Sequence, residues 1–431
     1  MSAGICIMNR QAIAMAADSA VTIGDHAAIH NSANKLFSLS RIAPVGLIIY
    51  ANASLMSVPM EIIVKEYKKQ LADKSFKTLK EYVYDFLAYI ESHSELFRFN
   101  INEMDYVSSV FADLMVGLRG DKDNNIRSQS EALNRPLNDK ELQAAYELSC
   151  KQTLTFIDSV PKRPDYNFRN YVRIHYLSHF ITMLSNDFSF NWLSQNRIQQ
   201  LCEKTCEIFD TDFNRNGYAG IAIAGYGEDE IYPNMVHLHI NGYLNEKLRY
   251  YTYESVCIQE NNTASVVPLA QTDVMQTFLF GINDRFLSDL SQQMPLRINQ
   301  NIDSIDDSLF APGKKDAVRA QINGVTSDVL RHVAEIARND YMKPIIQSVA
   351  SLPIEEMALL AESMINITSL RRKVALDQNI GTVGGPIDVA IISKGDGFIW
   401  LKRKHYFDRK YNPQYFYSHF EKIDRGVNDE N

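Results

Sequence analysis

The second residue of the chain is a serine, and its position would give it two reactive groups at once. Ser2 follows Met1, and a side chain as small as serine permits the removal of that methionine. The mature chain would then begin with a hydroxyl nucleophile and a free α-amine on one residue. The amine has an ordinary pKa of about 7.7–8.0, so it can act as general base near neutral pH. Ser2 therefore predicts nucleophilic catalysis.

Two charged residues follow Ser2 at positions that matter for this chemistry. A serine after the initiating methionine is common, so Ser2 alone is weak evidence. Asp18 ends the apolar run 12–17, and Lys35 precedes an apolar pair at 36–37. Taken singly, Asp18 would be a turn residue and Lys35 a solvated lysine at a strand edge.

The order of these residues resembles the N-terminus of mature proteasome β-subunits and of the bacterial HslV peptidase. In that family a catalytic threonine opens a strand, a second strand ends in Ala-Ala-Asp, and a lysine precedes an apolar pair. Here residues 16–18 have that tripeptide and the lysine is Lys35. Segment 384–397 resembles the family's Gly-Gly-x-Ile-Asp-Val strand and hairpin turn, and 217–226 with 231–243 resembles its central hairpin.

The resemblance implies an N-terminal nucleophile hydrolase of the α+β class, a four-layer αββα sandwich with helical insertions. It gives Ser2 the place of the catalytic threonine and sets Lys35 beside the hydroxyl, where its charge would lower the proton affinity of the nucleophile. Asp18 would pair with Lys35 and hold it charged. The backbone N–H of Ala51 would replace the family's glycine donor to the oxyanion, although alanine restricts the backbone more than glycine does.

The resemblance assigns two further site residues, but their positions match the family's pattern less directly. The family has a serine cluster at the start of its third helix, where this chain has Gln271 and Thr272. Either side chain would replace those hydrogen bonds, but Thr272 is equally suited to be an ordinary helix N-cap. The aspartate that orients the amine would be Asp377, several residues upstream of the family position. Serine keeps the hydroxyl of threonine but loses the methyl group that fixes its rotamer.

The apolar pattern predicts strands, two helices, strands, helices and strands, in that order. Thr78, three residues before Glu81, predicts a capping box at the second helix. We expect two stacked antiparallel sheets with helices on both outer faces.

This order predicts a discontinuous core with two helical insertions and a tail. The core comprises residues 2–96, 217–292 and 350–405, the insertions are 97–216 and 293–349, and the tail is 406–431. The insertions could gate access, bind a partner or prevent the stacking of rings.

Composition limits the partners of the chain. Its 431 residues include 44 Lys and Arg against 52 Asp and Glu, a formal net charge of −8, which argues against nucleic acid and anionic lipid. The apolar runs are far shorter than the roughly 18 residues of a membrane span. Five cysteines without a CxxC pair, and no secretory signal pattern, fit a reducing cytoplasm.

Two other clusters have simpler explanations. His237 and His239 alternate on one strand face and could begin a metal site, but two polar residues on a half-buried strand are the better explanation. Tyr250, Tyr251 and Tyr253 are best explained by strand packing. Because no phosphate loop, HExxH or GxSxG motif occurs, we expect no cofactor and no metal.

The favoured function is hydrolysis of peptide bonds by a bacterial-type cytoplasmic enzyme. The resemblance implies a peptide or unfolded-protein substrate, a homo-oligomer such as a ring, and an ATPase unfoldase as a partner. One alternative is a catalytically silent assembly protein with the same fold, which a retained Met1 or a buried Ser2 would favour. Another is a small-molecule amidase of the wider superfamily, with a closed pocket in each subunit.

Overall fold

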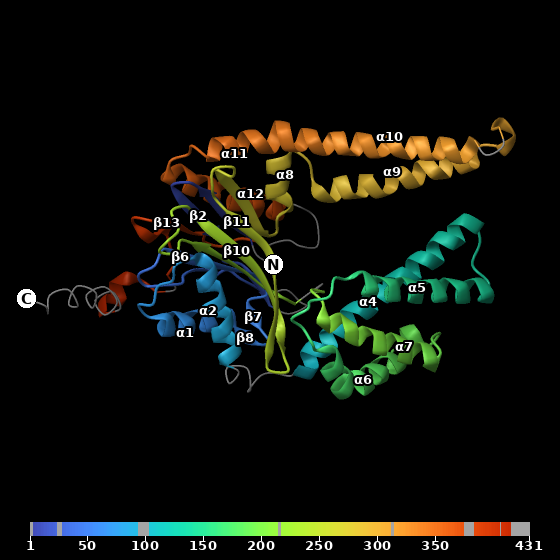
Figure 1. The fold of residues 1–431 in the computed structure, drawn as a ribbon, viewed down its shortest axis with the longest axis horizontal. Helices are drawn as coiled ribbons and strands as arrows, with labels where there is room; N and C mark the ends of the chain where they lie inside the picture. Colours follow the sequence, from blue (N-terminus) through green and yellow to red (C-terminus); the bar gives the residue numbers. More distant parts are fainter. Residues whose placement is uncertain are drawn as a thin grey trace, which may run out of the picture.

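Two five-stranded antiparallel sheets lie at the centre of the molecule (Figure 1). The computed structural model describes residues 3–23, 28–93, 103–213, 217–311, 314–374, 383–405 and 407–414. The first sheet has the strand order β12-β1-β2-β13-β14. Its strands are β1 (Ala3–Asn9), β2 (Ala12–Ala17), β12 (Ala264–Ala270), β13 (Asp388–Ser393) and β14 (Gly397–Lys402).

The second sheet has the strand order β11-β10-β9-β6-β5. Its strands are β5 (Leu36–Ser38), β6 (Val45–Ala51), β9 (Ala219–Gly225), β10 (Asn234–Leu244) and β11 (Lys247–Cys257). Two short pairs are formed by β3 (Val21–Ile23) with β4 (Ala28–His30), and by β7 (Ser54–Leu55) with β8 (Val58–Pro59). The antiparallel sheets, together with many helices, confirm the expected α+β class.

The hairpin of β1 and β2 forms because both strands are apolar except at Asn9 and every residue in them is buried. Asn9 makes the turn: its side-chain oxygen accepts hydrogen bonds from the backbone N–H groups of Gln11 at 2.9 Å and Ala12 at 3.2 Å. Its amide nitrogen donates to the carbonyl oxygens of Val349 and Leu352. A single buried asparagine therefore ties the β1–β2 turn to the helical segment before residue 354.

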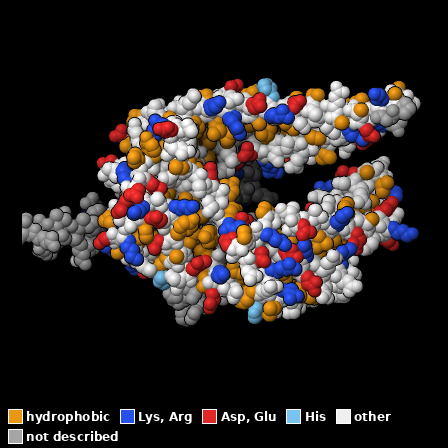
Figure 2. Space-filling model, in the orientation of Figure 1, with side chains coloured by type: hydrophobic (Ala, Val, Ile, Leu, Met, Phe, Trp, Pro, Cys, Tyr) orange, Lys and Arg blue, Asp and Glu red, His pale blue; other side chains and the backbone are white. Residues whose placement is uncertain are grey.

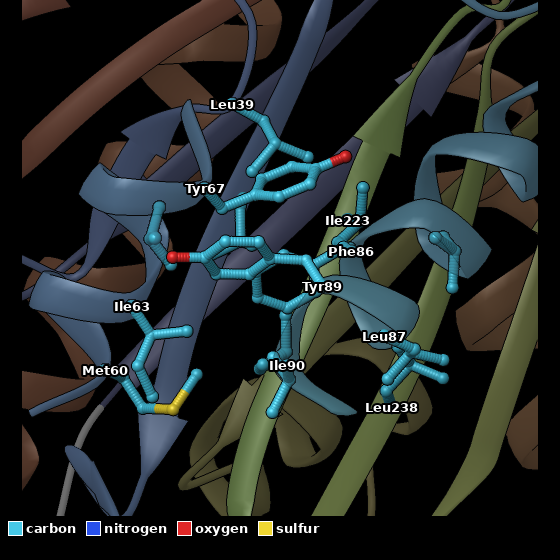
Figure 3. Packing of buried hydrophobic residues seen from close by; sticks show 14 of the residues in the cluster. Leu39, Met60, Ile63, Tyr67, Phe86, Leu87, Tyr89, Ile90, Ile223 and Leu238 are labelled. Atoms are coloured by element: carbon cyan, nitrogen blue, oxygen red, sulfur yellow. The ribbon is translucent and has the colours of Figure 1, made fainter. Parts of the chain in front are cut away.

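Three apolar clusters hold the sheets and their helices together. One is formed by residues of both sheets, among them Met15 of β2 and Ile48 of β6. A second packs the other face of β6, β9 and β10 against α1 (Met60–Leu71) and α2 (Leu79–Ser92), as Figure 3 shows for Tyr67 and Phe86. A third packs β1, β2 and β13 against α12 (Ile354–Val374), through residues such as Met364. The predicted capping box of α2 is present at Thr78.

The remaining helices lie in the segments predicted as insertions and beside the first sheet. They are α4 (Glu103–Leu133), α5 (Asp139–Ser159), α6 (Arg169–Asn186), α7 (Gln195–Thr205), α8 (Asp273–Phe280), α9 (Asp284–Ser304), α10 (Lys314–Ile336) and α11 (Lys343–Val349). A π-helical turn (Ala337–Met342) joins α10 to α11. Helices α9 and α10 form an antiparallel pair that projects from the sheets, and Figure 2 shows a hollow between this pair and the arm formed by α4 and α5.

Helices α4 to α7 have an apolar core of their own, in which Phe111 and Phe180 stack with ring centroids 4.5 Å apart. Arg249 of β11 is fully buried and connects this core to the second sheet. Its guanidinium donates to the hydroxyl of Tyr106 at 2.5 Å and to the carbonyl oxygen of Thr211 at 2.9 Å. The exact limits of the core and the insertions stay a prediction.

No helix within the described ranges is both long enough and apolar enough to cross a bilayer.

Candidate functional site

Asp18 and Lys35 form an ion pair in the interior of the protein. Lys35 Nζ lies 2.5 Å from Asp18 Oδ1, and the two side chains are 4% and 0% exposed. Lys35 Nζ also donates to the carbonyl oxygen of Ala20 at 2.5 Å. Burial lowers the pKa of Lys35, while the adjacent carboxylate opposes that shift. Lys35 is therefore a buried, fixed cation rather than a solvated edge residue.

The Asp18 carboxylate is a junction between three segments of the chain. Oδ1 accepts from Ala3 N at 2.9 Å as well as from Lys35, and Oδ2 accepts from Ala20 N at 3.2 Å and Gly384 N at 3.1 Å. In return, Asp18 N donates to the carbonyl oxygen of Ala3 at 3.0 Å. The start of β1, the end of β2 and the segment before β13 thus meet at one carboxylate.

The glycine pair before β13 fits this junction for a steric reason. Gly385 has φ +76°, and a Cβ there would lie 2.9 Å from Asn31 Cβ, so a larger residue would be both strained and obstructed. Its neighbour Gly384 supplies the N–H that reaches Asp18 and accepts from Ser19 N at 3.1 Å. The turn that brings Gly384 N to Asp18 therefore depends on the positive φ of Gly385.

Two of the predicted catalytic residues, Ser2 and Asp377, lie outside the described residues. The described chain starts at Ala3, and its amide nitrogen is the atom that the peptide bond joins to Ser2. That nitrogen donates to the same Asp18 oxygen as Lys35 does. The described geometry therefore brings Asp18 and Lys35 to the residue that follows Ser2.

Ala51 ends β6 in an unusual backbone conformation for alanine, with φ +59°. Ile49 N donates to the carbonyl oxygen of Lys35 at 2.8 Å, whereas Asn52 N donates to Tyr218 on the opposite side of the strand. Because N–H directions alternate along an antiparallel strand, the Ala51 N–H lies on the Lys35 side. The structure thus places this predicted donor on the same strand edge as Lys35.

Thr272 is at the N-cap position of α8, but its hydroxyl makes no capping bond. It contacts Gln276 Oε1 at 3.1 Å instead. Gln271 is buried. Both residues follow Ala270, which is the β12 partner of Ala3, so the chain brings them near the start of β1.

A pocket of about 390 Å³ lies beside this strand end, and sequence reasoning missed it. We call this pocket the His–Tyr pocket. Its lining includes Ala270 and Thr272, together with six ionisable or aromatic side chains. These six are Tyr50, Tyr218, His237, His239, Tyr253 and Glu254. The alternation of the two histidines along one strand was the signal in the sequence, and it was interpreted as two polar residues on a half-buried strand.

The histidines of this pocket are neutral at neutral pH. They are 4% and 5% exposed, and burial lowers the pKa of His237 to about 3 and that of His239 to about 4. His239 Nε2 lies 2.6 Å from the Tyr50 hydroxyl, which also contacts His237 Nε2. His239 Nδ1 lies 2.6 Å from the Tyr251 hydroxyl. In the described ranges, no cluster of three or more His, Cys, Asp or Glu side chains is suited to hold a metal ion.

No family model matches the chain, and no curated protein matches it. Similar solved structures include an Anbu (Gly-1) mutant from Hyphomicrobium sp. strain MC1, with 10% identity, TM-score 0.28 and coverage of 100% of this chain and 99% of that one. Anbu, an ancestral β-subunit, from Yersinia bercovieri has 10% identity, TM-score 0.29 and coverage of 99% and 94%. The helical assembly of the Anbu complex from Pseudomonas aeruginosa has 8% identity, TM-score 0.31 and coverage of 98% and 96%.

These comparisons correct the expected family. Membership of the proteasome β-subunit and HslV family is wrong, because no family model matches and the three solved structures named above are Anbu proteins at 8–10% identity. The short motifs that suggested it have local explanations: Asp18 binds Gly384 N, and Gly385 needs its positive φ. At TM-scores of 0.28–0.31, the Anbu structures say nothing about the activity of this chain.

Proposed function

We propose that this protein is an N-terminal nucleophile hydrolase that cleaves amide bonds through Ser2 after removal of Met1. The observation that carries the proposal is the shared Asp18 oxygen, which accepts from Lys35 Nζ and from the amide nitrogen joined to Ser2. A buried cation held one residue from a hydroxyl and an α-amine would favour their deprotonated forms.

The proposal includes a four-layer αββα arrangement of the core. Its support is the order of the apolar clusters: one between the two sheets, one between the second sheet and α1 with α2, and one between the first sheet and α12. In such an arrangement the start of β1 lies at the rim of the two sheets, where substrate can approach.

In the proposed reaction, the Ser2 α-amine, directly or through a water, takes the hydroxyl proton while Oγ attacks the substrate carbonyl carbon. The Ala51 N–H donates to the oxyanion of the tetrahedral intermediate. Collapse breaks the C–N bond, and the proton passes to the leaving amine. Water then hydrolyses the ester and returns the hydroxyl to Ser2, while Asp18 keeps Lys35 in position throughout.

We propose peptides or unfolded polypeptides as substrates and a cytoplasmic homo-oligomer as the working form. Support for association comes from the projecting pair α9 and α10, whose large apolar side chains include exposed Phe286, Leu296 and Val325. An ATPase unfoldase becomes necessary only if the copies enclose their active sites.

A small-molecule amidase is the second candidate, because the His–Tyr pocket has the size of a small-ligand site. The two candidates differ in substrate: the amidase would cleave small amides and leave peptides intact.

The test is hydrolysis of a library of fluorogenic peptides and small amides by the wild type, Ser2→Ala and Ser2→Thr. The proposal expects loss of at least ~100-fold in Ser2→Ala, since the nucleophile is removed, and retention of measurable activity in Ser2→Thr. Full activity in a clean preparation of Ser2→Ala would refute it.

A further inference from the structure

The His–Tyr pocket is a built cavity rather than a gap between loops. Its walls come from β6, β10, β11, β12 and α8, from the end of the π-helical turn and α11, and from Tyr218, just before β9. Gly220 of β9 leaves room for the ring of Tyr50, because a Cβ at that position would lie 2.2 Å from Tyr50 Cζ. The ring of Tyr50 is therefore fixed by the backbone of the neighbouring strand.

Aromatic rings form much of the pocket's wall. His239 stacks between Tyr218, at a centroid distance of 4.0 Å and 21° between planes, and Tyr253, at 4.8 Å and 18°. His237 meets the Tyr253 ring edge-on at 4.9 Å. Faces of tyrosine rings carry partial negative charge and attract cations within about 6 Å.

The charged groups around the pocket favour a cation as well. None of the described residues that line it is a lysine or an arginine, and the two histidines are neutral. Glu254 is the one carboxylate among the lining residues in these ranges, and burial raises its pKa. Burial is the main cause of the raised pKa of the Cys6 thiol, and the nearby Glu254 carboxylate is the second cause. The carboxylate is therefore close enough to influence a buried group.

One of the lining residues, His237, has a buried polar atom without a hydrogen-bond partner in the described part of the chain. His237 Nδ1 has no hydrogen-bond partner among the described residues, although the side chain is 4% exposed. Buried polar atoms of this kind are usually satisfied. In the tautomer whose Nε2 donates to the Tyr50 hydroxyl, Nδ1 is an acceptor, so a ligand donor is its natural partner. An ammonium or guanidinium group supplies such donors and no acceptor.

We propose that the His–Tyr pocket binds a cationic group, held by the rings of Tyr218 and Tyr253 and by the carboxylate of Glu254. The lining residue Ala270 pairs with Ala3, which places the pocket beside the residue joined to Ser2. The cation is therefore the ammonium or guanidinium of a lysine or arginine side chain in the substrate, a part of the inference that rests on the proposed function.

The test uses full-length Ser2→Ala protein, so that binding is measured without turnover. Isothermal titration calorimetry compares Nα-acetyl-lysine methylamide with Nα-acetyl-norleucine methylamide, which has the same chain without the charge. The lysine ligand is expected to bind at least ~10-fold tighter. A second pair, choline and its neutral isostere 3,3-dimethyl-1-butanol, shows whether a free ammonium compound is preferred over a side chain.

Four variants, each made in the Ser2→Ala protein, locate the cation. Glu254→Gln and Tyr253→Leu should each reduce the preference for lysine to less than ~3-fold, whereas Tyr253→Phe retains the ring and should keep it. Glu260→Gln, an exposed residue outside the pocket, is the matched control and should change nothing. Thermal unfolding of each variant checks that it is folded.

Equal binding of the lysine and norleucine ligands, or no binding of either, would overturn the inference. A lysine preference that survives Glu254→Gln and Tyr253→Leu would place the cation elsewhere and would overturn it too. Choline binding without lysine binding would remove the link to the substrate. If Ser2→Ala protein binds the lysine ligand as expected but the wild type hydrolyses no amide, the proposed function fails and the pocket assignment stands.

Discussion

The ammonium of Lys35 lies 2.5 Å from Asp18 Oδ1 where solvent does not reach the carboxylate. Buried charges are expensive to hold unless they are paired and hydrogen-bonded. Here the carboxylate also accepts from the backbone N–H groups of Ala3, Ala20 and Gly384. This satisfied pair is the centre of the proposed site, and its energetics can be measured separately from catalysis.

Asp18→Asn should lower the free energy of unfolding by about 3–5 kcal/mol, because it leaves the Lys35 charge buried without its partner. The double variant Asp18→Asn with Lys35→Met should recover part of the loss, since no unpaired charge remains. Urea unfolding measures both. The control is Glu66→Gln, whose ion pair with Lys69 is exposed and should contribute less than ~1 kcal/mol. If Asp18→Asn were as stable as the wild type, the Asp18 carboxylate would not be compensating the buried charge of Lys35.

The buried histidines should make the protein sensitive to acid. Their pKa values of about 3 for His237 and about 4 for His239 lie below the ordinary 6.5. Between these values the unfolded chain binds protons that the folded protein excludes, so the free energy of unfolding rises with pH. This stabilisation is complete above about pH 6.5 and should fall by ~2 kcal/mol per histidine at pH 5.

Urea unfolding from pH 7.5 to 4.5 checks this expectation. His239→Gln should flatten the dependence on pH because the titrating group is gone. His332, whose side chain is 72% exposed, provides the control, and His332→Gln should leave the slope unchanged. An identical slope in the wild type and in His239→Gln would contradict the assignment of a neutral, buried His239.

Gly385→Ala should destabilise the junction at Asp18. The new Cβ would lie 2.9 Å from Asn31 Cβ at a φ of +76°. We therefore expect the free energy of unfolding to fall by about 1–3 kcal/mol. Gly395→Ala, in the β13–β14 turn with no atom within 4 Å of its Cβ position, is the matched control and should cost less than ~1 kcal/mol. Equal thermal stability of the two variants would contradict the steric account of Gly385.

Much of the local structure could be predicted from the sequence. The apolar run 12–17 forms the strand β2, and Thr78 with Glu81 predicted the capping box. These features depend on residues that are close in the chain, so periodicity and spacing are enough to find them.

The candidate site could be predicted only in part, because its contacts join distant segments. Asp18 meets Gly384 across 366 positions, and the Tyr50 hydroxyl meets His239 across 189. Nothing in the local pattern around His239 says that the ring of Tyr50 crosses Gly220 of β9 and reaches β10. For the same reason the burial of Lys35, which depends on how β5 lies against β6, was not visible in the sequence.

The most direct test of the central claim is the intact mass of the protein, made with no tag at its N-terminus, before and after treatment with a peptide epoxyketone. This reagent needs both a hydroxyl and a free α-amine on one residue to form its ring adduct. Loss of Met1 followed by a single adduct in the wild type, and no adduct in Ser2→Ala, is the predicted result. A protein that retains Met1, or one that loses Met1 and forms no adduct while Ser2→Ala behaves identically, would contradict catalysis by Ser2.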